Sequence, residues 1–295
     1  MTHEPSQVLQ DDENFLVELI DWQGKPAVKK TAKPTAPETR VKRMQNDVLG
    51  MQFFTDLAQK QPDLALHVPA VFDSGADFYI REFTDDPPVA KEDMSLEEVK
   101  PRLDKLAELL ARLDRLQVKQ EVGYKGSSNY ENLELSISRW ADENVADKLI
   151  SEANSKRIKE ISAGFGQYLE PGIAHGDMSA YKHAYLRPDN KITLIDYENF
   201  SSRHARYYDM AWCFTRLYSF AKTRAIPKYF LSSFLAMAEP RTHQSEQLMA
   251  VLIQRTLGLQ KDAISDLENK GIDFRDQAKE LLELVLENKL ELLHD

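Results

Sequence analysis

The first third of the chain contains two kinds of hydrophobic periodicity. Residues 15–23, FLVELIDWQ, have apolar side chains at alternate positions and, with residues 25–33, KPAVKKTAK, they flank Gly24. This arrangement predicts a β-hairpin. Residues 43–58 change to helical spacing, and two further apolar stretches follow within residues 67–83. The predicted order is strand, strand, helix, strand, strand.

The pattern changes again near residue 90. The sequence TDDPP at residues 84–88 favours a turn, because proline fixes its own φ and restrains the preceding residue. Beyond it the apolar positions fall mostly at helical spacing, in segments around Trp140 and at 105–116, 157–169, 207–221 and 277–293. We therefore predict an α+β protein of two lobes, a small sheet-containing lobe over residues 1–86 and a larger, mainly helical lobe over residues 87–295.

The last helical segment has a strong apolar face that includes Leu281, Leu282 and Val285. A helix of this pattern usually packs on its own chain, so we expect it to close the core of the second lobe. A partner-binding helix is the alternative.

Composition narrows the class of protein. The chain has 295 residues, of which 42% are hydrophobic, enough for one large domain or two modest lobes. A net charge of −10 argues against a mainly electrostatic grip on nucleic acid or anionic lipid. No signal peptide or apolar run of bilayer length is visible. Cys213 is the only cysteine, so we expect no intramolecular disulfide, no cysteine-based zinc site and a cytoplasmic location.

The chemistry is concentrated in residues 173–200, IAHGDMSAYKHAYLRPDNKITLIDYENF. A short apolar approach ends in His175 and Asp177, and AYL and ITLID, separated by the turn RPDN, predict a hairpin that ends in Asp196. Two carboxylates therefore meet at one sheet edge. One carboxylate can orient a hydroxyl and accept its proton, while another can hold Mg²⁺ against phosphate oxygens. This division suits phosphoryl transfer.

These motifs resemble a known family. HGD at 175–177 followed by IDYE at 195–198 is similar to the signature of the aminoglycoside phosphotransferase and choline kinase family, small-molecule kinases with a protein-kinase-like fold. The resemblance extends to AVK at 27–29, where such kinases keep a strand lysine, to IREF at 80–83, which resembles the hinge, and to RYYDMAW at 206–212. By motif order the match covers most of the chain.

The resemblance implies a role for each of four residues. Asp177 would be the catalytic carboxylate that faces the acceptor hydroxyl, and Asp196 would hold Mg²⁺. Lys29 would contact the phosphates of ATP, and Asp47, at the helix position usually held by a glutamate, would steady Lys29. The residues also allow simpler alternatives. Without the order of the motifs, Lys29 would be one of a solvated run of lysines, and Asp47 could face water.

Further roles follow from the same resemblance. Glu82 and Phe83 would form the nucleotide-binding hinge, which makes residues 1–86 the nucleotide-binding lobe and residues 87–295 the catalytic and substrate-binding lobe. His175 would belong to the catalytic loop, more as a hydrogen-bonding structural residue than as a proton shuttle. Asp209 would brace that loop. Glu198 would lie near the substrate.

Two features depart from the family pattern. Five residues after Asp177 the family has an asparagine that helps to bind a second metal, and here that position is Lys182. Lysine is no Mg²⁺ ligand, so three alternatives stay open: its ammonium replaces a cation, His183 takes the ligand position through a one-residue shift, or the metal site is incomplete. The second departure is that no glycine precedes Phe15 to let backbone amides close over phosphates.

Two classes of function therefore follow. The first is an ATP- and Mg²⁺-dependent kinase of a small hydroxylated molecule, for which the acidic composition and Glu198 suggest a cationic amine. The second is a kinase-like binding or scaffolding module that has lost transfer chemistry, favoured by Lys182, Asp47 and the missing glycine loop. A protein kinase ranks below both, because the chain has HGD and IDYE in place of HRD and DFG.

Overall fold

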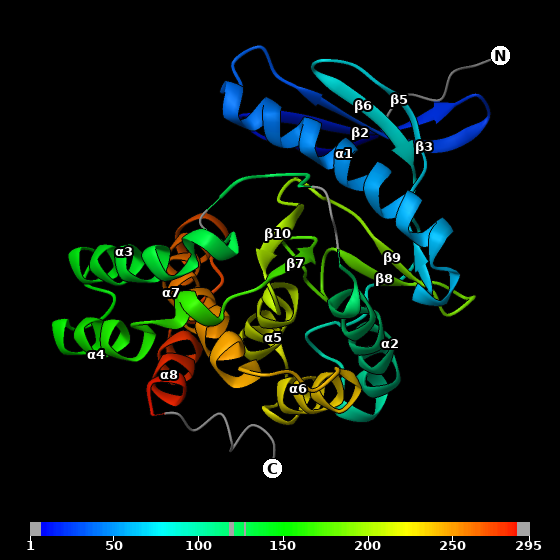
Figure 1. Ribbon diagram of the computed structural model, residues 1–295. Helices are drawn as coiled ribbons and strands as arrows, with labels where there is room; N and C mark the ends of the chain where they lie inside the picture. Colours follow the sequence, from blue (N-terminus) through cyan, green and yellow to red (C-terminus); the bar gives the residue numbers. More distant parts are fainter. Residues whose placement is uncertain (1–6, 118–120, 127, 288–295) are drawn as a thin grey trace.

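The computed structural model describes residues 7–117, 121–126 and 128–287. Figure 1 shows two lobes, an antiparallel sheet with one long helix above and a mainly helical lobe below. This is the α+β architecture that the sequence predicts.

The upper lobe is built on a five-stranded antiparallel sheet. In spatial order its strands are β1 (Gln7–Asp11), β2 (Phe15–Trp22), β3 (Lys25–Ala32), β6 (Phe78–Glu82) and β5 (Val71–Ser74). The predicted hairpin is confirmed as β2 and β3, which pair without a break from Phe15 opposite Ala32 to Trp22 opposite Lys25. β1 was not predicted, because it is an exposed edge strand with no buried face to impose a hydrophobic pattern.

Helix α1 (Glu38–Lys60) lies between this sheet and the lower lobe (Figure 1). Its buried face includes Met44, Met51 and Phe54, which belong to the core. Gly50 lies so close to the lower lobe that an added Cβ would be 2.5 Å from the Cβ of Tyr197. Glycine therefore lets the helix backbone pack directly on the segment that follows Asp196.

The lower lobe consists mainly of helices. They are α2 (Leu96–Arg115), α3 (Leu133–Ala146), α4 (Glu152–Ser162), α5 (Tyr208–Phe220), α6 (Ala225–Met237), α7 (Gln244–Lys270) and α8 (Arg275–Leu286), with 3₁₀ turns at Pro62–Leu64, Tyr130–Asn132 and Phe165–Tyr168. α8 buries Leu281, Leu282 and Val285 against the core, so its described part closes its own domain as predicted. The rest of the predicted helix, 288–293, lies outside the described residues.

Two small sheets lie where the lobes meet. One has the order β4 (Leu66–His67), β9 (Ile192–Leu194), β8 (Ala184–Leu186), and the other pairs β7 (Pro171–Ala174) with β10 (Ser201–Ala205). The β8–β9 hairpin was predicted. β4 was not, since its two residues gain their order from pairing with β9, far along the chain.

The chain passes between the lobes after β6 and before α2. Pro88 bridges to Tyr185, and the N–H of Val89 donates to the carbonyl of Ala184. These contacts attach the segment to the lower lobe, while the boundary at residue 86 stays a prediction. Among the described residues, no helix is both long and apolar enough to cross a membrane.

Candidate active site

The loop that carries Asp177 depends on a glycine. Strand β7 ends at Ala174, and the chain turns through Gly176 with φ of +87°. A Cβ there would lie 2.2 Å from the carbonyl oxygen of Asn199, so both the backbone conformation and the space require glycine. The N–H groups of His175 and Gly176 donate to the two carboxylate oxygens of Asp209, at 2.7 and 2.9 Å. Asp209, in the first turn of α5, therefore braces the loop.

His175 is a buried connector. Its Nε2 donates to the carbonyl of Ile195 at 2.8 Å, and its Nδ1 accepts from the N–H of Asp177 at 3.3 Å. Burial lowers the pKa of His175 to about 3, so the ring is neutral near neutral pH. Both nitrogens are engaged in joining the Asp177 loop to the end of β9, which favours the structural role over a proton shuttle.

Asp196 follows the end of β9 in a left-handed conformation, with φ of +68°. This conformation is uncommon for a residue other than glycine, and such residues cluster at functional sites. It directs one carboxylate oxygen to within 3.5 Å of the Nζ of Lys30 and the other to within 3.5 Å of the Nε2 of His183. Burial raises the pKa of Asp196, but the charges of Lys30 and His183 outweigh it and the net shift is downward. Asp196 is therefore ionised.

Lys30, rather than Lys29, is the strand lysine that reaches this site. Its Nζ pairs with Glu198, lies 3.8 Å from Asp47 and sits over the ring of Phe15. Burial lowers the pKa of Lys30. The neighbouring groups, Tyr79 and the three acids Asp196, Asp47 and Glu198, raise it by more, so the net pKa lies well above its usual value. The prediction that Lys29 converges with Asp196 is wrong. Neighbouring residues of a strand point to opposite faces of the sheet, and the Nζ of Lys29 lies over the ring of Phe78.

Asp47 is completely buried, so the alternative that it faces water is excluded. One of its oxygens accepts from the hydroxyl of Tyr79 at 2.6 Å and the other from the N–H of Tyr197 at 2.7 Å. Burial raises its pKa, and Lys30 opposes that shift. Asp47 thus ties α1 to the sheet and to the segment after Asp196, and it steadies Lys30 instead of Lys29.

Glu198 lies against Lys30. The ammonium of Lys30 therefore pairs with the carboxylate of Glu198, which the family resemblance had placed near the substrate. Burial raises the pKa of Glu198, and the charge of Lys30 opposes this shift. One reason to expect a cationic acceptor is thereby weakened, since the positive partner of Glu198 belongs to the chain itself.

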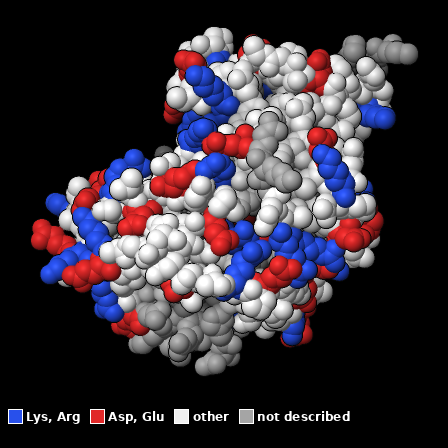
Figure 2. Space-filling view, in the orientation of Figure 1, with Lys and Arg blue, Asp and Glu red and all other residues white. Residues whose placement is uncertain are grey.

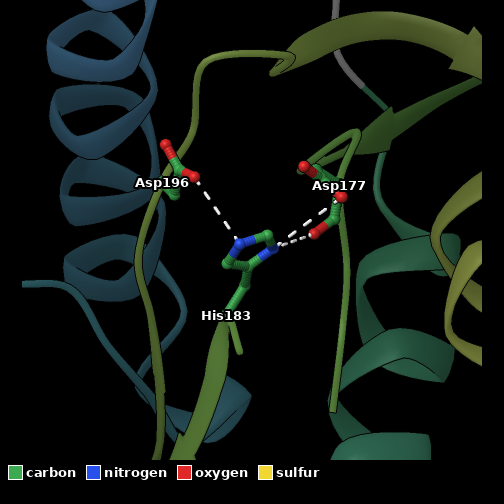
Figure 3. A group of neighbouring side chains, drawn as sticks. All are labelled: Asp177, His183 and Asp196. Atoms are coloured by element: carbon green, nitrogen blue, oxygen red, sulfur yellow. Dashed lines mark hydrogen bonds and ion pairs between the residues drawn. The ribbon is translucent and has the colours of Figure 1, made fainter. Parts of the chain in front are cut away.

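His183, rather than Lys182, faces the two aspartates (Figure 3). Its Nδ1 lies 2.5 Å from the backbone carbonyl of Asp177, and its Nε2 faces Asp196. Lys182 is exposed, and its backbone forms part of the turn that begins at Ser179. Of the three alternatives raised by the sequence, the one-residue shift matches this geometry.

The hinge residues lie further along the sheet. In the register of β3 and β6, Glu82 opposes Ala27, whereas Tyr79 opposes Lys30. Three residues of strand separate the two positions by about 10 Å. Glu82 accepts from the N–H of Ala70 at 3.2 Å, and the N–H of Phe83 donates to the carbonyl of Pro26 at 3.4 Å. Their contact with a nucleotide stays a prediction.

The turn between β1 and β2 is closed by its own acid. The Oδ1 of Asp12 accepts from the N–H groups of Asn14 and Phe15, at 2.7 and 2.8 Å. Backbone amides that could bind phosphate are thus occupied by a carboxylate. The segment before Phe15, which contains no glycine, therefore forms a turn whose backbone amides bind Asp12.

Two arginines near Asp177 were missed by the sequence analysis. Arg216 on α5 pairs with Asp262 at 2.9 Å, and Arg255 on α7 lies 3.4 Å above the ring of Trp212. Burial raises the pKa of Asp177, while the charges of His183, Arg216 and Arg255 lower it. No motif marks these arginines, because they come from two helices that only the fold brings together.

The comparison with solved structures shows the fold. The streptomycin–ATP complex of the phosphotransferase APH(2")-IIa aligns over 97% of this chain and 93% of its own, with 13% identity and a TM-score of 0.57. A putative fructosamine-3-kinase from Haemophilus somnus 129PT covers 97% and 92%, with 15% identity and a TM-score of 0.62. A Plasmodium vivax ethanolamine kinase covers 97% and 83%, with 13% identity and a TM-score of 0.59.

The chain therefore has the protein-kinase-like fold of small-molecule kinases and phosphotransferases, as its motifs led us to expect. No family model and no curated protein matches the sequence. At these identities the likeness shows the fold, and the activity rests on the site itself.

His204 provides a prediction about pH. It is buried on β10, and its Nε2 donates to the carbonyl of Asn199 at 2.8 Å. Burial lowers its pKa to about 4. The unfolded chain, with a histidine pKa of about 6.5, binds more protons than the folded chain between these values, so stability falls as pH falls.

We expect His204→Gln, which keeps a donor for Asn199, to reduce this loss by about 1 kcal/mol per pH unit below about pH 6.5. Urea unfolding of both proteins at several pH values between about 7 and 5 measures the difference in slope. Equal slopes for the two proteins would show that His204 does not titrate differently in the folded state.

Proposed function

We propose that this protein is an ATP-dependent phosphotransferase that acts on a hydroxyl of a small molecule. The observation that carries the proposal is the convergence of Lys30 and Asp196, 3.5 Å apart, with Asp177, which His183 links to Asp196. These residues come from β3, from the end of β9 and from the loop after β7. A site that combines a buried cation, an ionised carboxylate and a second carboxylate has the parts that phosphoryl transfer uses.

In this proposal Lys30 binds phosphate oxygens of ATP. Its ammonium has three donors, which are now directed at Glu198, Asp196 and Asp47. Phosphate would take over the contact of Glu198, while Asp47 stays in place because Tyr79 and Tyr197 hold both of its oxygens. Residues 1–86 would then form the nucleotide-binding lobe, with Glu82 and Phe83 near the base.

Asp177 acts on the acceptor. Its carboxylate orients the hydroxyl and takes its proton while the hydroxyl oxygen forms a bond to the terminal phosphorus and the bond to the ADP oxygen breaks. Burial raises the pKa of Asp177, which makes the carboxylate a better proton acceptor. His175, neutral and held at both nitrogens, keeps the loop in place.

The donor set also fits a divalent cation. The side chains of Asp177, His183 and Asp196 bring their ligand atoms within 4.8 Å of one another, and the Oδ2 of Asp196 faces the Nε2 of His183 at 3.5 Å. A divalent cation bound there supplies positive charge to the phosphate oxygens. Asp196 and His183 are the residues that would hold it.

The charges near Asp177 bear on the acceptor. Arg216 and Arg255 share the carboxylate of Asp262, which leaves a net positive charge on this group of three side chains. The carboxylate of Asp177 balances that charge, so the charges near this loop favour a neutral hydroxylated acceptor at least as much as a cationic one.

We also propose that the protein binds nucleotide and acceptor rather than nucleic acid or membrane. We propose in addition that it is cytoplasmic. On the face drawn in Figure 2, acidic side chains lie among and beside the basic ones, including along the band of basic side chains on the lower lobe. The buried thiol of Cys213 is consistent with a reducing compartment.

The second candidate function is a kinase-like binding module without transfer activity. The specific observation in its favour is the β1–β2 turn, where Asp12 occupies the amides that could bind phosphate. Such a module can bind a nucleotide weakly or not at all, and it transfers no phosphate.

Two measurements on the full chain separate these functions. Calorimetry of ATP with a divalent cation tests binding, and transfer of the labelled terminal phosphate to a panel of cationic, neutral and anionic hydroxyl compounds tests catalysis. The proposal predicts binding and at least one labelled product. Binding without any product across the panel favours the module, and the absence of nucleotide binding rejects the proposal.

A further inference from the structure

The orientation of His183 determines which of its nitrogens carries a proton. Its Nδ1 lies 2.5 Å from the backbone carbonyl oxygen of Asp177. A carbonyl oxygen can only accept, so Nδ1 must be the donor. In the neutral imidazole the lone pair therefore resides on Nε2.

That lone pair points at a second acceptor. Nε2 lies 3.5 Å from the Oδ2 of Asp196, as the left-hand dashed line in Figure 3 shows. A lone pair and a carboxylate at this separation repel each other unless a positive species lies between them. A second proton on the ring and a metal ion both meet this need, and the detection of a metal-bound nitrogen separates them. Metal–ligand bonds of about 2.0–2.2 Å place two ligands of one ion about 3–4 Å apart, which matches the observed separation.

The position of His183 is built into the local fold. The carbonyl oxygen of Ser179 accepts from three successive N–H groups, those of Lys182, His183 and Ala184, at 3.3, 2.9 and 3.1 Å. This tight turn leads straight into β8, where Ala184 pairs with Leu194. The N–H of Ile195 donates to the carbonyl of His183, which fixes the backbone of His183 beside Asp196.

We propose that the ion held by His183 and Asp196 is a first-row transition ion, such as Co²⁺ or Ni²⁺, in preference to Mg²⁺. Mg²⁺ is a hard cation that prefers oxygen ligands, whereas imidazole nitrogen suits the later first-row ions. Mn²⁺ lies at the weak-binding end of that series, so it is the most demanding spectroscopic probe of the nitrogen ligand. This inference rests on the proposed function, because it names the ion of the same site. It departs from the asparagine pattern, which offers an oxygen at this place.

Direct detection of a nitrogen ligand tests the inference. Mn²⁺ is added to the nucleotide-free full chain, and electron spin echo modulation from ¹⁴N reports whether a histidine nitrogen is bound to the ion. We expect modulation in the unchanged protein and its loss in His183→Asn. Lys182→Asn is the matched control, since the neighbouring side chain is exposed and the nitrogen signal should persist.

A competition titration then measures the preference between the two ions. Displacement of Mn²⁺ by Mg²⁺ should become easier by at least about tenfold in His183→Asn. Loss of a residue that only orients a metal ligand already lowers metal affinity about tenfold or more, and loss of the ligand itself should lower it at least as much. The unchanged protein should require a large excess of Mg²⁺. The spin-echo result on the unchanged protein needs no variant, so poor folding of His183→Asn would leave the test intact.

Failure of this inference differs from failure of the proposed function. Mn²⁺ binding without nitrogen modulation, equal competition by Mg²⁺, or no ion binding at all would overturn the inference, even if phosphate transfer with Mg²⁺ were found. Nitrogen-bound Mn²⁺ in a protein that transfers no phosphate would support the ion site and reject the kinase.

Discussion

Replacing Lys30 with methionine is expected to remove nearly all ATP-dependent transfer and to destabilise the fold. The ammonium neutralises phosphate charge in the proposed reaction, and loss of one such electrostatic contact lowers turnover about 10²–10³-fold. The same change leaves Asp47, Asp196 and Glu198 facing one another without their cation. Removing one partner of a buried ion pair costs about 3–5 kcal/mol of unfolding free energy.

Lys29→Met is the matched control for this prediction. Lys29 is the adjacent residue of the same strand, but its Nζ lies over Phe78 and not beside the acids. We expect Lys29→Met to keep ATP affinity and turnover and to change stability by less than about 0.5 kcal/mol. Urea unfolding and ATP calorimetry on both variants measure the contrast. A larger loss of ATP binding in Lys29→Met than in Lys30→Met would reverse the assignment.

Asp177→Asn is expected to lower turnover about 10²–10⁴-fold, the usual contribution of a positioned general base. An amide keeps the size of the side chain and still binds a hydroxyl, but it cannot accept a proton. ATP affinity should change little, because Asp177 faces the acceptor rather than the phosphates in the proposed reaction.

Steady-state kinetics with the best acceptor, together with ATP calorimetry, checks both parts. Asp56, an acid on α1 that lies outside the site, offers the control Asp56→Asn, for which we expect unchanged turnover. Full activity of Asp177→Asn would remove its catalytic role, and equal losses of ATP affinity and turnover would place it at the nucleotide instead.

Local sequence signals were strong enough to predict the hairpin that leads to Asp196. The RPDN turn with its flanking apolar triplets specifies β8 and β9, so this feature can be predicted without the rest of the fold. The turn at Gly176 was not predicted, because its need for glycine comes from the close approach of Asn199.

Side-chain direction could not be predicted in the same way. Lys29 and Lys30 are adjacent, and the choice between them depends on which sheet face meets Asp47, which α1 brings from elsewhere in the chain. The choice between Lys182 and His183 depends on a turn closed by hydrogen bonds to Ser179. A one-residue difference in register leaves the composition of a motif unchanged but reverses what its side chains face.

Tertiary packing also determined the elements that the sequence analysis missed. β4 is ordered by β9, and α7 is so widely buried that its apolar positions do not mark one clean face. The arginines near Asp177 lie on α5 and α7, and only the packing of these helices brings them together.

The most direct test of the central claim is a crystal structure with a non-hydrolysable ATP analogue and a divalent cation. We predict phosphate oxygens on the Nζ of Lys30 in place of Glu198, the cation on Asp196, and the terminal phosphate facing Asp177. Phosphates lying against Lys29, or an analogue bound away from both aspartates, would contradict it.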